Sequence, residues 1–168
     1  MDTFKEISPE ELNKNPFRMI GKEWMLIAAS DKEKANAMTA SWGGMGVMWN
    51  SPVAYIAIRE TRYTKEFVDR ADKLTLNFFG DGFRKELAYF GRTSGRDVDK
   101  IAKTGMDVRI ENGAPIFQGA ETVLVCRKLF SSKYNAENFL DKSILDKFYN
   151  GDSMHSLYIV EIERVLTK

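Results

Sequence analysis

The sequence has few of the residues that build disulfides and metal sites, and it has no long apolar run. Cys126 is the only cysteine, which excludes an internal disulfide and a thiol-rich metal site. His155 is the only histidine, so a zinc site would need carboxylates for most of its ligands. No apolar run reaches the ~18 to 20 residues that cross a bilayer. We therefore expect neither a metal centre nor a membrane-spanning segment.

The sequence also lacks the motifs of common nucleotide-binding proteins and serine hydrolases. It has no G-x-x-x-x-G-K-S/T loop, and the glycines around Gly43 lack the G-x-G-x-x-G spacing. No G-x-S-x-G elbow is present either. These absences disfavour nucleotide binding through either phosphate loop and hydrolysis by an activated serine.

Neither sign of charge predominates. Lys and Arg number 25 against 24 Asp and Glu, and no block of like charge stands out. A general surface for nucleic acid or for an anionic membrane is therefore not expected. The opening segment, MDTFKEISPEELNKNPF, has no apolar stretch and does not read as a secretory signal, so we expect a cytoplasmic protein.

The pattern of apolar residues predicts one mainly β domain. The 168 residues, 43% of them hydrophobic, show no linker or repeat, so a single domain over residues 1–168 is expected. Short apolar runs predict strands over 23–30, 36–50 (one or two strands), 53–59, 74–79, 120–130 and 155–166. Helical spacing predicts helices over 65–71, 83–90, 97–103 and 139–149. Because few helices separate the later strands, an antiparallel β-barrel with peripheral helices, an α+β arrangement, is favoured over a doubly wound parallel sheet.

Two local features carry more specific expectations. Thr64 is placed to cap the first of these helices, and the third is expected to be capped at Arg96–Asp97 or nearby. The three glycines between Gly43 and Gly46 interrupt a strand pattern. They indicate a bulge or the close approach of another group to the backbone.

A run of motifs resembles one protein family. The segment NAMTASWGGMGVMWN at 36–50, followed by Ser51-Pro52 and IRETRYTKEF, is similar to the flavin reductase-like proteins, especially the flavoredoxin-type branch. The resemblance continues through LTLNFF at 74–79 and SGRDVDK at 94–100, and it ends in the strand that contains His155 and Glu161. It implies a split barrel, usually dimeric, that holds FMN without a covalent bond.

The resemblance assigns the first motif to the flavin ring and its ribityl chain. An isoalloxazine ring is flat and mostly apolar with polar atoms on its rim, so it suits a strand edge that offers backbone groups and small side chains. The residues placed beside it are Asn36, Met38, Thr39, Ala40, Ser41 and Trp42. The alternative is that Met38 and Trp42 are core residues and that Thr39 and Ser41 face outward on a strand.

The FMN phosphate needs cations together with N–H or hydroxyl donors, ideally at a helix N-terminus. One cluster near the predicted helix start can supply them: Arg59, Arg62, Tyr63 and Thr64. A second cluster, Ser94-Gly95-Arg96 with Lys100, could approach the same phosphate from another loop. The alternative for each cation is a solvated surface position. Arg62 and Thr64 are the stronger candidates.

Two further residues have open roles. His155 lies in GDSMH, where the family commonly has a glycine or aspartate and then histidine, and Ser153-Met154 are inserted before it. It could touch the flavin or an incoming nicotinamide, or it could be structural. Cys126 lies in an apolar run and is interpreted as a core residue rather than a redox thiol.

The resemblance implies an oxidoreductase that passes hydride or electrons from NAD(P)H or a protein donor, through FMN, to an acceptor. The chemistry would be that of the cofactor, so no acid–base pair is required. The missing dinucleotide motif agrees with a nicotinamide held mainly by stacking. One alternative is an FMN-binding electron carrier or flavin store without NAD(P)H turnover. Another is a split barrel that holds haem or a deazaflavin instead. A homodimer and a redox partner protein are further expectations.

Overall fold

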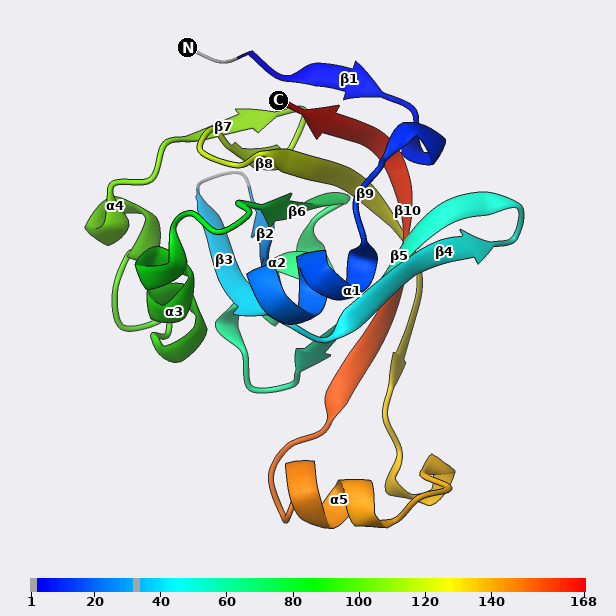
Figure 1. Ribbon diagram of the computed structural model, residues 1–168. Coiled ribbons are helices and arrows are strands. Elements are labelled where there is room, and N and C mark those ends of the chain that lie inside the picture. The colour runs from blue at the N-terminus through cyan, green and yellow to red at the C-terminus, as the bar shows by residue number, and fades with distance from the viewer. Residues whose placement is uncertain (1–2, 32–33) are drawn as a thin grey trace.

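The computed structural model describes residues 3–31 and 34–168, and its centre is one curved antiparallel sheet (Figure 1). Along the sheet the paired strands follow the order β3 (Ala35–Ala40), β2 (Met25–Ser30), β6 (Lys73–Phe78), β9 (Thr122–Lys133), β10 (His155–Thr167), β5 (Ser51–Arg59) and β4 (Gly43–Met48). The two end strands, β3 and β4, are consecutive in the chain and are joined by Ser41 and Trp42. Because so short a link brings the sheet's ends together, the sheet closes into an incomplete barrel.

Smaller elements surround this barrel. The short strand β1 (Lys5–Ile7) pairs with β10, and β7 (Val108–Glu111) and β8 (Ala114–Phe117) form a separate hairpin. The helices are α1 (Pro16–Arg18), which continues into a π-helical segment (Met19–Glu23), α2 (Tyr63–Arg70), α3 (Arg84–Arg92), α4 (Lys100–Thr104) and α5 (Ser143–Phe148). Single 3₁₀ turns lie at Pro9–Glu11 and Ala136–Asn138. Figure 1 shows the segment with α5 projecting from the barrel between β9 and β10.

The core consists of two apolar clusters on opposite faces of the sheet. Side chains alternate along a strand, so Ile27 of β2 packs in one cluster and its neighbour Leu26 in the other. Strand β2 is consequently buried along its whole length, which explains why it reads as an unbroken apolar run. Cys126 lies in the first cluster, and its burial raises the pKa of the thiol, as expected for a core cysteine.

The predicted fold class, a mainly β barrel with peripheral helices, is confirmed. All six predicted strand regions contain strands, and region 36–50 contains two, β3 and β4. The predicted helices begin or end a few residues away from the observed ones. The largest difference is the predicted helix 139–149, where only 143–148 is α-helical. Strand β1 and the β7–β8 hairpin were not predicted.

The predicted cap of α2 is wrong, whereas the cap of α4 lies close to the predicted position. Helix α2 begins two residues earlier than predicted, with Arg62 at the N-cap position, so Thr64 lies inside the first turn. There its hydroxyl accepts a hydrogen bond from Asn36. Helix α4 is capped by Asp99, whose carboxylate accepts from the backbone N–H of Ala102 at 3.0 Å.

The glycines of β4 mark a close approach and not a bulge. The pairing of β4 with β5 runs without a register shift. Tyr55 of β5 lies so close to this stretch that a Cβ added at Gly43 would overlap the Tyr55 carbonyl oxygen. The Tyr55 ring lies 3.6 Å from the position of a Cβ at Gly44.

Along the described parts of the chain, no helix is long and apolar enough to span a membrane.

Candidate functional site

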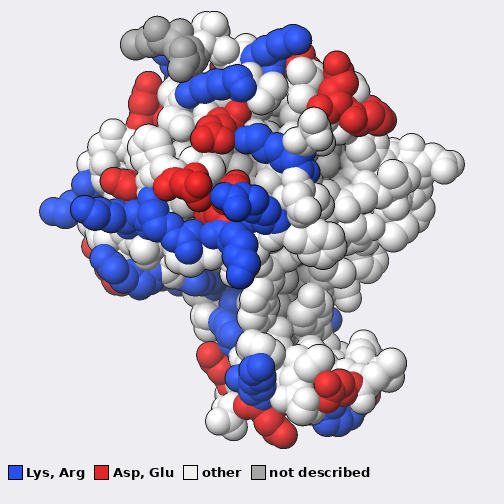
Figure 2. All heavy atoms as spheres, in the orientation of Figure 1, with Lys and Arg blue, Asp and Glu red and all other residues white. Residues whose placement is uncertain are grey.

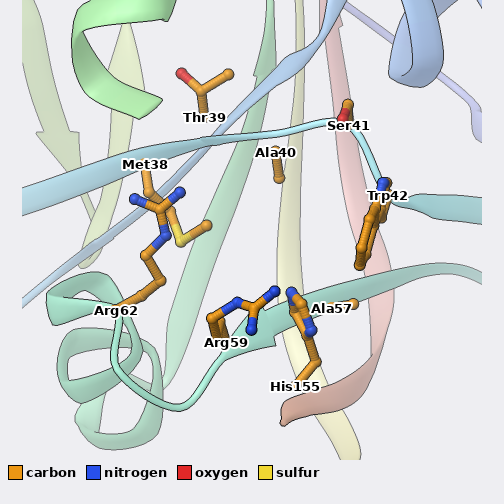
Figure 3. Close-up of a pocket in the computed structure, with 9 residues that line it drawn as sticks. All are labelled: Met38, Thr39, Ala40, Ser41, Trp42, Ala57, Arg59, Arg62 and His155. Atoms are coloured by element: carbon orange, nitrogen blue, oxygen red, sulfur yellow. The ribbon is translucent and has the colours of Figure 1, made fainter. Parts of the chain in front are cut away.

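Two adjoining cavities open where the barrel is incomplete. Their volumes are about 210 and 330 Å³, and they share Met38, Arg59 and Arg62, so they form one continuous groove. The first cavity is lined by Met38, Thr39, Ala40, Ser41, Trp42, Ala57, Arg59, Arg62 and His155 (Figure 3). The second is lined by Met38, Arg59, Thr61, Arg62, Tyr63, Thr64, Arg92, Thr93, Ser94, Gly95 and Lys100. Small-molecule sites usually measure roughly 300–1,000 Å³, a range that the groove reaches.

Strand β3 forms one wall of the first cavity. It is an end strand of the sheet path, and no described strand pairs with its outer edge. Side chains alternate along it, and Figure 3 shows Ala40 and Trp42 on the side of His155 while Thr39 points the opposite way. The hydroxyl of Thr39 donates to the carbonyl oxygen of Leu87 at 2.6 Å. Strand β3 therefore offers the cavity apolar side chains and an open backbone edge.

Two cations with little solvent contact line the second cavity. Lys100 is 3% exposed and its ammonium donates to the carbonyl oxygen of Phe90 at 3.2 Å. Arg62 is half-buried and donates to the carbonyl oxygen of Gly91 at 2.7 Å. Within residues 3–31 and 34–168, neither cation has a carboxylate within 4 Å. Burial and the charge of Arg62 lower the pKa of Lys100 to about 8, and burial and Arg59 lower the pKa of Arg62.

This pair of cations is what an anion site requires. Buried charges are normally paired, because an unpaired charge loses its hydration without compensation. A phosphate between Arg62 and Lys100 would supply that compensation. The first turn of α2 adds backbone N–H groups that have no acceptor within the helix. The donors present in the second cavity therefore fit a phosphate.

Thr64 and Asn36 form a buried pair at the edge of the second cavity. The amide of Asn36 donates to the hydroxyl of Thr64 at 2.9 Å. Because the Thr64 oxygen accepts this bond, its own hydrogen can be donated to a ligand in the cavity that Thr64 lines. Asn36 lines neither cavity and acts on the site through Thr64.

Of the other predicted phosphate ligands, Ser94 and Arg96 differ in whether they line the second cavity. Ser94 lines the second cavity, but Arg96 does not. Arg96 forms an ion pair with Glu66, donates to the carbonyl oxygen of Thr61 at 3.0 Å and lies over the ring of Tyr63. Its guanidinium is thus engaged outside the groove.

Arg59 is held by the loop that precedes β10. It donates to the carbonyl oxygen of Ser153 at 2.8 Å and to that of Phe148 at 3.3 Å, and it forms an ion pair with Asp152 at 3.1 Å. Its guanidinium also lies 5.4 Å from the centroid of the Tyr149 ring. Arg59 therefore borders both cavities while most of its donors fix this loop.

His155 is the first residue of β10, and its imidazole forms part of the first cavity beside Arg59 and Trp42 (Figure 3). Its ring centroid lies 5.1 Å from that of Trp42, and its Nδ1 is hydrogen-bonded to the hydroxyl of Tyr149 at 2.9 Å. Burial, Arg59 and Arg62 lower its pKa to about 4. The imidazole is therefore neutral near pH 7.

The groove includes residues that the sequence did not single out: Ala57, Thr61, Arg92 and Thr93. Thr93 directly precedes the predicted Ser94, so its contribution could have been inferred from that motif. Ala57 is an apolar strand residue without a distinctive signal. Of the predicted residues, only Asn36 and Arg96 lie outside the lining of the two cavities.

Comparisons with known proteins agree with this geometry. Residues 17–168 match the family model described as Flavin reductase like domain. The flavoredoxin of Methanosarcina acetivorans is 22% identical, with a TM-score of 0.69 over 87% of this chain and 68% of that chain. The FMN-binding protein of Thermus thermophilus with bound p-hydroxybenzaldehyde is 19% identical, with a TM-score of 0.68 over 100% of this chain and 82% of that chain.

A third similar structure is the NADH:FAD oxidoreductase SgcE6 of Streptomyces globisporus, in complex with NAD and FAD fragments. It is 17% identical, with a TM-score of 0.63 over 87% of this chain and 74% of that chain. At these identities the structural likenesses establish the fold. No curated protein matches the chain in sequence.

Proposed function

Because the chain belongs to the flavin reductase-like family, we propose that it binds FMN without a covalent bond and acts as a flavin-dependent oxidoreductase. The observation that carries this proposal is the pair formed by Arg62 and Lys100, two poorly hydrated cations without a carboxylate partner in the described chain. They lie in the half of the groove that also contains Thr64 and the start of α2. A phosphate monoester is the ligand group that these donors suit best.

The ring of FMN is assigned to the first cavity. Met38, Ala40 and Trp42 offer apolar surface there, and the open edge of β3 offers backbone donors and acceptors for the polar rim of an isoalloxazine. Met38 borders both cavities, so the ribityl chain is assigned to its vicinity. Thr39 and Ser41 contribute through their backbone in this proposal.

Bound FMN supplies a ring that accepts a hydride or electrons and passes them on. We propose that the donor is NAD(P)H or a redox protein and that the acceptor is free flavin, an iron centre or a protein. The similar SgcE6 structure contains NAD and FAD fragments, which supports a nicotinamide donor. The chain's own residues would hold the phosphate, shield one side of the ring and present the neutral imidazole of His155 to the first cavity.

We also propose that the protein is a homodimer. The hairpin of β4 and β5 carries exposed apolar side chains, with Val47 73% and Trp49 59% exposed. No charged residue occurs from Ala35 to Ile58, and Figure 2 shows the projecting hairpin as an uncharged surface. Strand β4 also has an edge that no described strand covers. Such a surface on an end strand favours association with a second copy.

An absorption spectrum and an anaerobic reduction test the proposal. We expect the purified protein to carry FMN, or to take it up with micromolar or better affinity, and to show an oxidised flavin band. Bleaching of this band by NADH or NADPH supports a reductase. Binding without bleaching by either nucleotide favours an electron carrier. Failure of FMN, FAD and riboflavin all to bind would refute the central claim.

A further inference from the structure

His155 and Tyr149 form a buried pair behind the first cavity. The hydroxyl oxygen of Tyr149 lies 2.9 Å from Nδ1 of His155, and the two side chains are 4% and 8% exposed. Tyr149 is the C-cap residue that follows helix α5, whereas His155 begins strand β10. The bond thus closes the loop between these elements and leaves Nε2 as the imidazole nitrogen that is not engaged by it.

The direction of this hydrogen bond follows from the partners at hand. A tyrosine hydroxyl can donate to Nδ1, or Nδ1–H can donate to the tyrosine oxygen. Within the described chain, the Tyr149 hydroxyl has no second hydrogen-bond partner. If it accepted from Nδ1–H, its own hydrogen would be buried without an acceptor, which costs about 1–3 kcal/mol. The hydroxyl is therefore the donor, and the hydrogen of the neutral imidazole resides on Nε2.

The surrounding charges keep the imidazole in this neutral form. Burial, Arg59 and Arg62 lower the pKa of His155, and only the carboxylate of Asp152 acts in the opposite direction. Burial and the neighbouring Tyr134 raise the pKa of Tyr149, so its hydroxyl keeps the proton that it donates. Between about pH 5 and 8 neither member of the pair changes its charge.

Aromatic packing limits rotation of both rings. The ring of Tyr149 packs against Phe139 with centroids 5.6 Å apart, and His155 packs against Trp42 and Tyr134 at 5.1 and 6.3 Å. On the other side, the guanidinium of Arg59 lies over the Tyr149 ring. The pair is therefore held in one arrangement before any ligand enters.

We propose that Tyr149 is a positioning residue, which fixes His155 as the Nε2–H tautomer so that the imidazole presents a hydrogen-bond donor to an acceptor atom of the ligand in the first cavity. The carbonyl oxygens and ring nitrogens of an isoalloxazine have this acceptor chemistry. The inference rests on the proposed function for the identity of the ligand but not for the tautomer. It assigns His155 the role of a donor and not of a base.

Because the chain has a single histidine, its imidazole can be observed by ¹⁵N–¹H NMR without assignment. In the ligand-free protein we expect one tautomer, Nε2–H, that stays neutral down to about pH 5. In Tyr149→Phe, which lacks the donor, we expect a mixture of tautomers, while burial, Arg59 and Arg62 still keep the pKa of the imidazole low. Tyr134→Phe is the matched control, since no hydrogen bond joins its hydroxyl to His155 within the described chain, and it should keep the wild-type tautomer.

A second arm tests contact with the ligand. Riboflavin or FMN should shift the Nε2–H resonance, and Tyr149→Phe should slow flavin reduction by NAD(P)H severalfold while changing the FMN dissociation constant less than about twofold. Bound flavin that no nicotinamide reduces would refute the reductase function and leave the tautomer assignment standing. An Nδ1–H tautomer in the wild type, or a resonance unmoved by bound flavin, would overturn the inference. If Tyr149→Phe does not fold by circular dichroism, these wild-type spectra still decide it.

Discussion

The amide of Asn36 donates a 2.9 Å hydrogen bond to the hydroxyl of Thr64, and this buried bond joins strand β3 to the first turn of helix α2. The two elements border the groove from different sides, so the bond fixes the distance between its walls. It also orients the Thr64 hydroxyl. A residue outside the lining thus determines how a lining residue donates.

The substitution Gly95→Ala tests the Asn36–Thr64 hydrogen bond, because a Cβ at position 95 would overlap the Asn36 amide. We expect Gly95→Ala to displace Asn36 and to weaken FMN binding about two- to tenfold, the equivalent of one hydrogen bond of roughly 0.5–1.5 kcal/mol. Gly91→Ala is the matched control. A Cβ there lies 3.6 Å from Thr39, an ordinary contact, so FMN binding should be unchanged. Equal losses in titrations of the two variants would contradict the role of the Asn36–Thr64 bond.

Arg62 is predicted to hold the FMN phosphate. Arg62→Ala should remove a charge-assisted hydrogen bond worth about 1.5–3 kcal/mol and weaken FMN binding roughly ten- to hundredfold. Riboflavin, which has no phosphate, should bind almost as before. Arg96→Ala serves as the control, because Arg96 pairs with Glu66 outside the groove and its loss should change FMN affinity less than about threefold. Fluorescence titration of both ligands would measure these values, and equal weakening of FMN and riboflavin by Arg62→Ala would rule out the phosphate contact.

Lys100 should make FMN binding depend on pH. A phosphate dianion predominates above about pH 6, and Lys100 in the ligand-free protein loses its proton near pH 8. Phosphate favours the protonated amine, so the affinity for FMN should rise from pH 5 to 7 and fall above pH 8. Lys100→Met should bind FMN at least tenfold more weakly at pH 7 and lose the decline above pH 8. A decline that persists in Lys100→Met would show that another group titrates.

Lys100 should also make the stability of the folded protein depend on pH. The folded state lowers the pKa of Lys100 from 10.5 to about 8, so between these values the unfolded chain binds more protons. The stability of the ligand-free protein should therefore gain a contribution as pH rises from 8 to 10.5. Lys100→Met should remove this contribution and raise the midpoint of thermal unfolding at pH 7, because it removes a buried unpaired charge. Unfolding scans without FMN would measure both effects.

The dimer proposal predicts a particle of about twice the chain mass of 19.2 kDa in light scattering at micromolar concentration. Val47→Lys places a charge on the uncharged hairpin and should shift the particle toward the monomer. A substitution at the distant exposed Ile110 of β7, Ile110→Lys, should not. A wild-type monomer with FMN bound would contradict the proposal.

The strands were predictable because burial dominates their sequence. Strand β2 is covered on both faces, so its apolar run is continuous and cannot be mistaken for a surface segment. The β7–β8 hairpin was missed although Asn112-Gly113 carries the turn signal, with φ of 48° and 83°. Each of its strands has only four residues, too few for a clear alternation.

Site residues were predictable where they are consecutive in the sequence, and not where their role depends on partners brought close by the fold. Residues 38–42 line one cavity as a continuous segment, so a motif could indicate them. Arg59 and Arg96 were indistinguishable from Arg62 in sequence. Their partners, Asp152 and Glu66, lie 93 and 30 positions away and become neighbours only through the fold. The helix cap at Arg62 also escaped prediction, because arginine is not a favoured capping residue.

The two-residue link between β3 and β4 must keep its length, whereas the segment between β9 and β10 can vary in length. Extra residues at Ser41 or Trp42 would open the barrel wall where the ring is proposed to lie. The excursion between β9 and β10 contains α5, and Arg59, Trp42 and His155 hold its final part through their contacts with Phe148, Tyr149 and Ser153. A related protein could thus meet a different reaction partner through a longer or altered tip of this excursion, while Arg62 and Lys100 would still hold the phosphate.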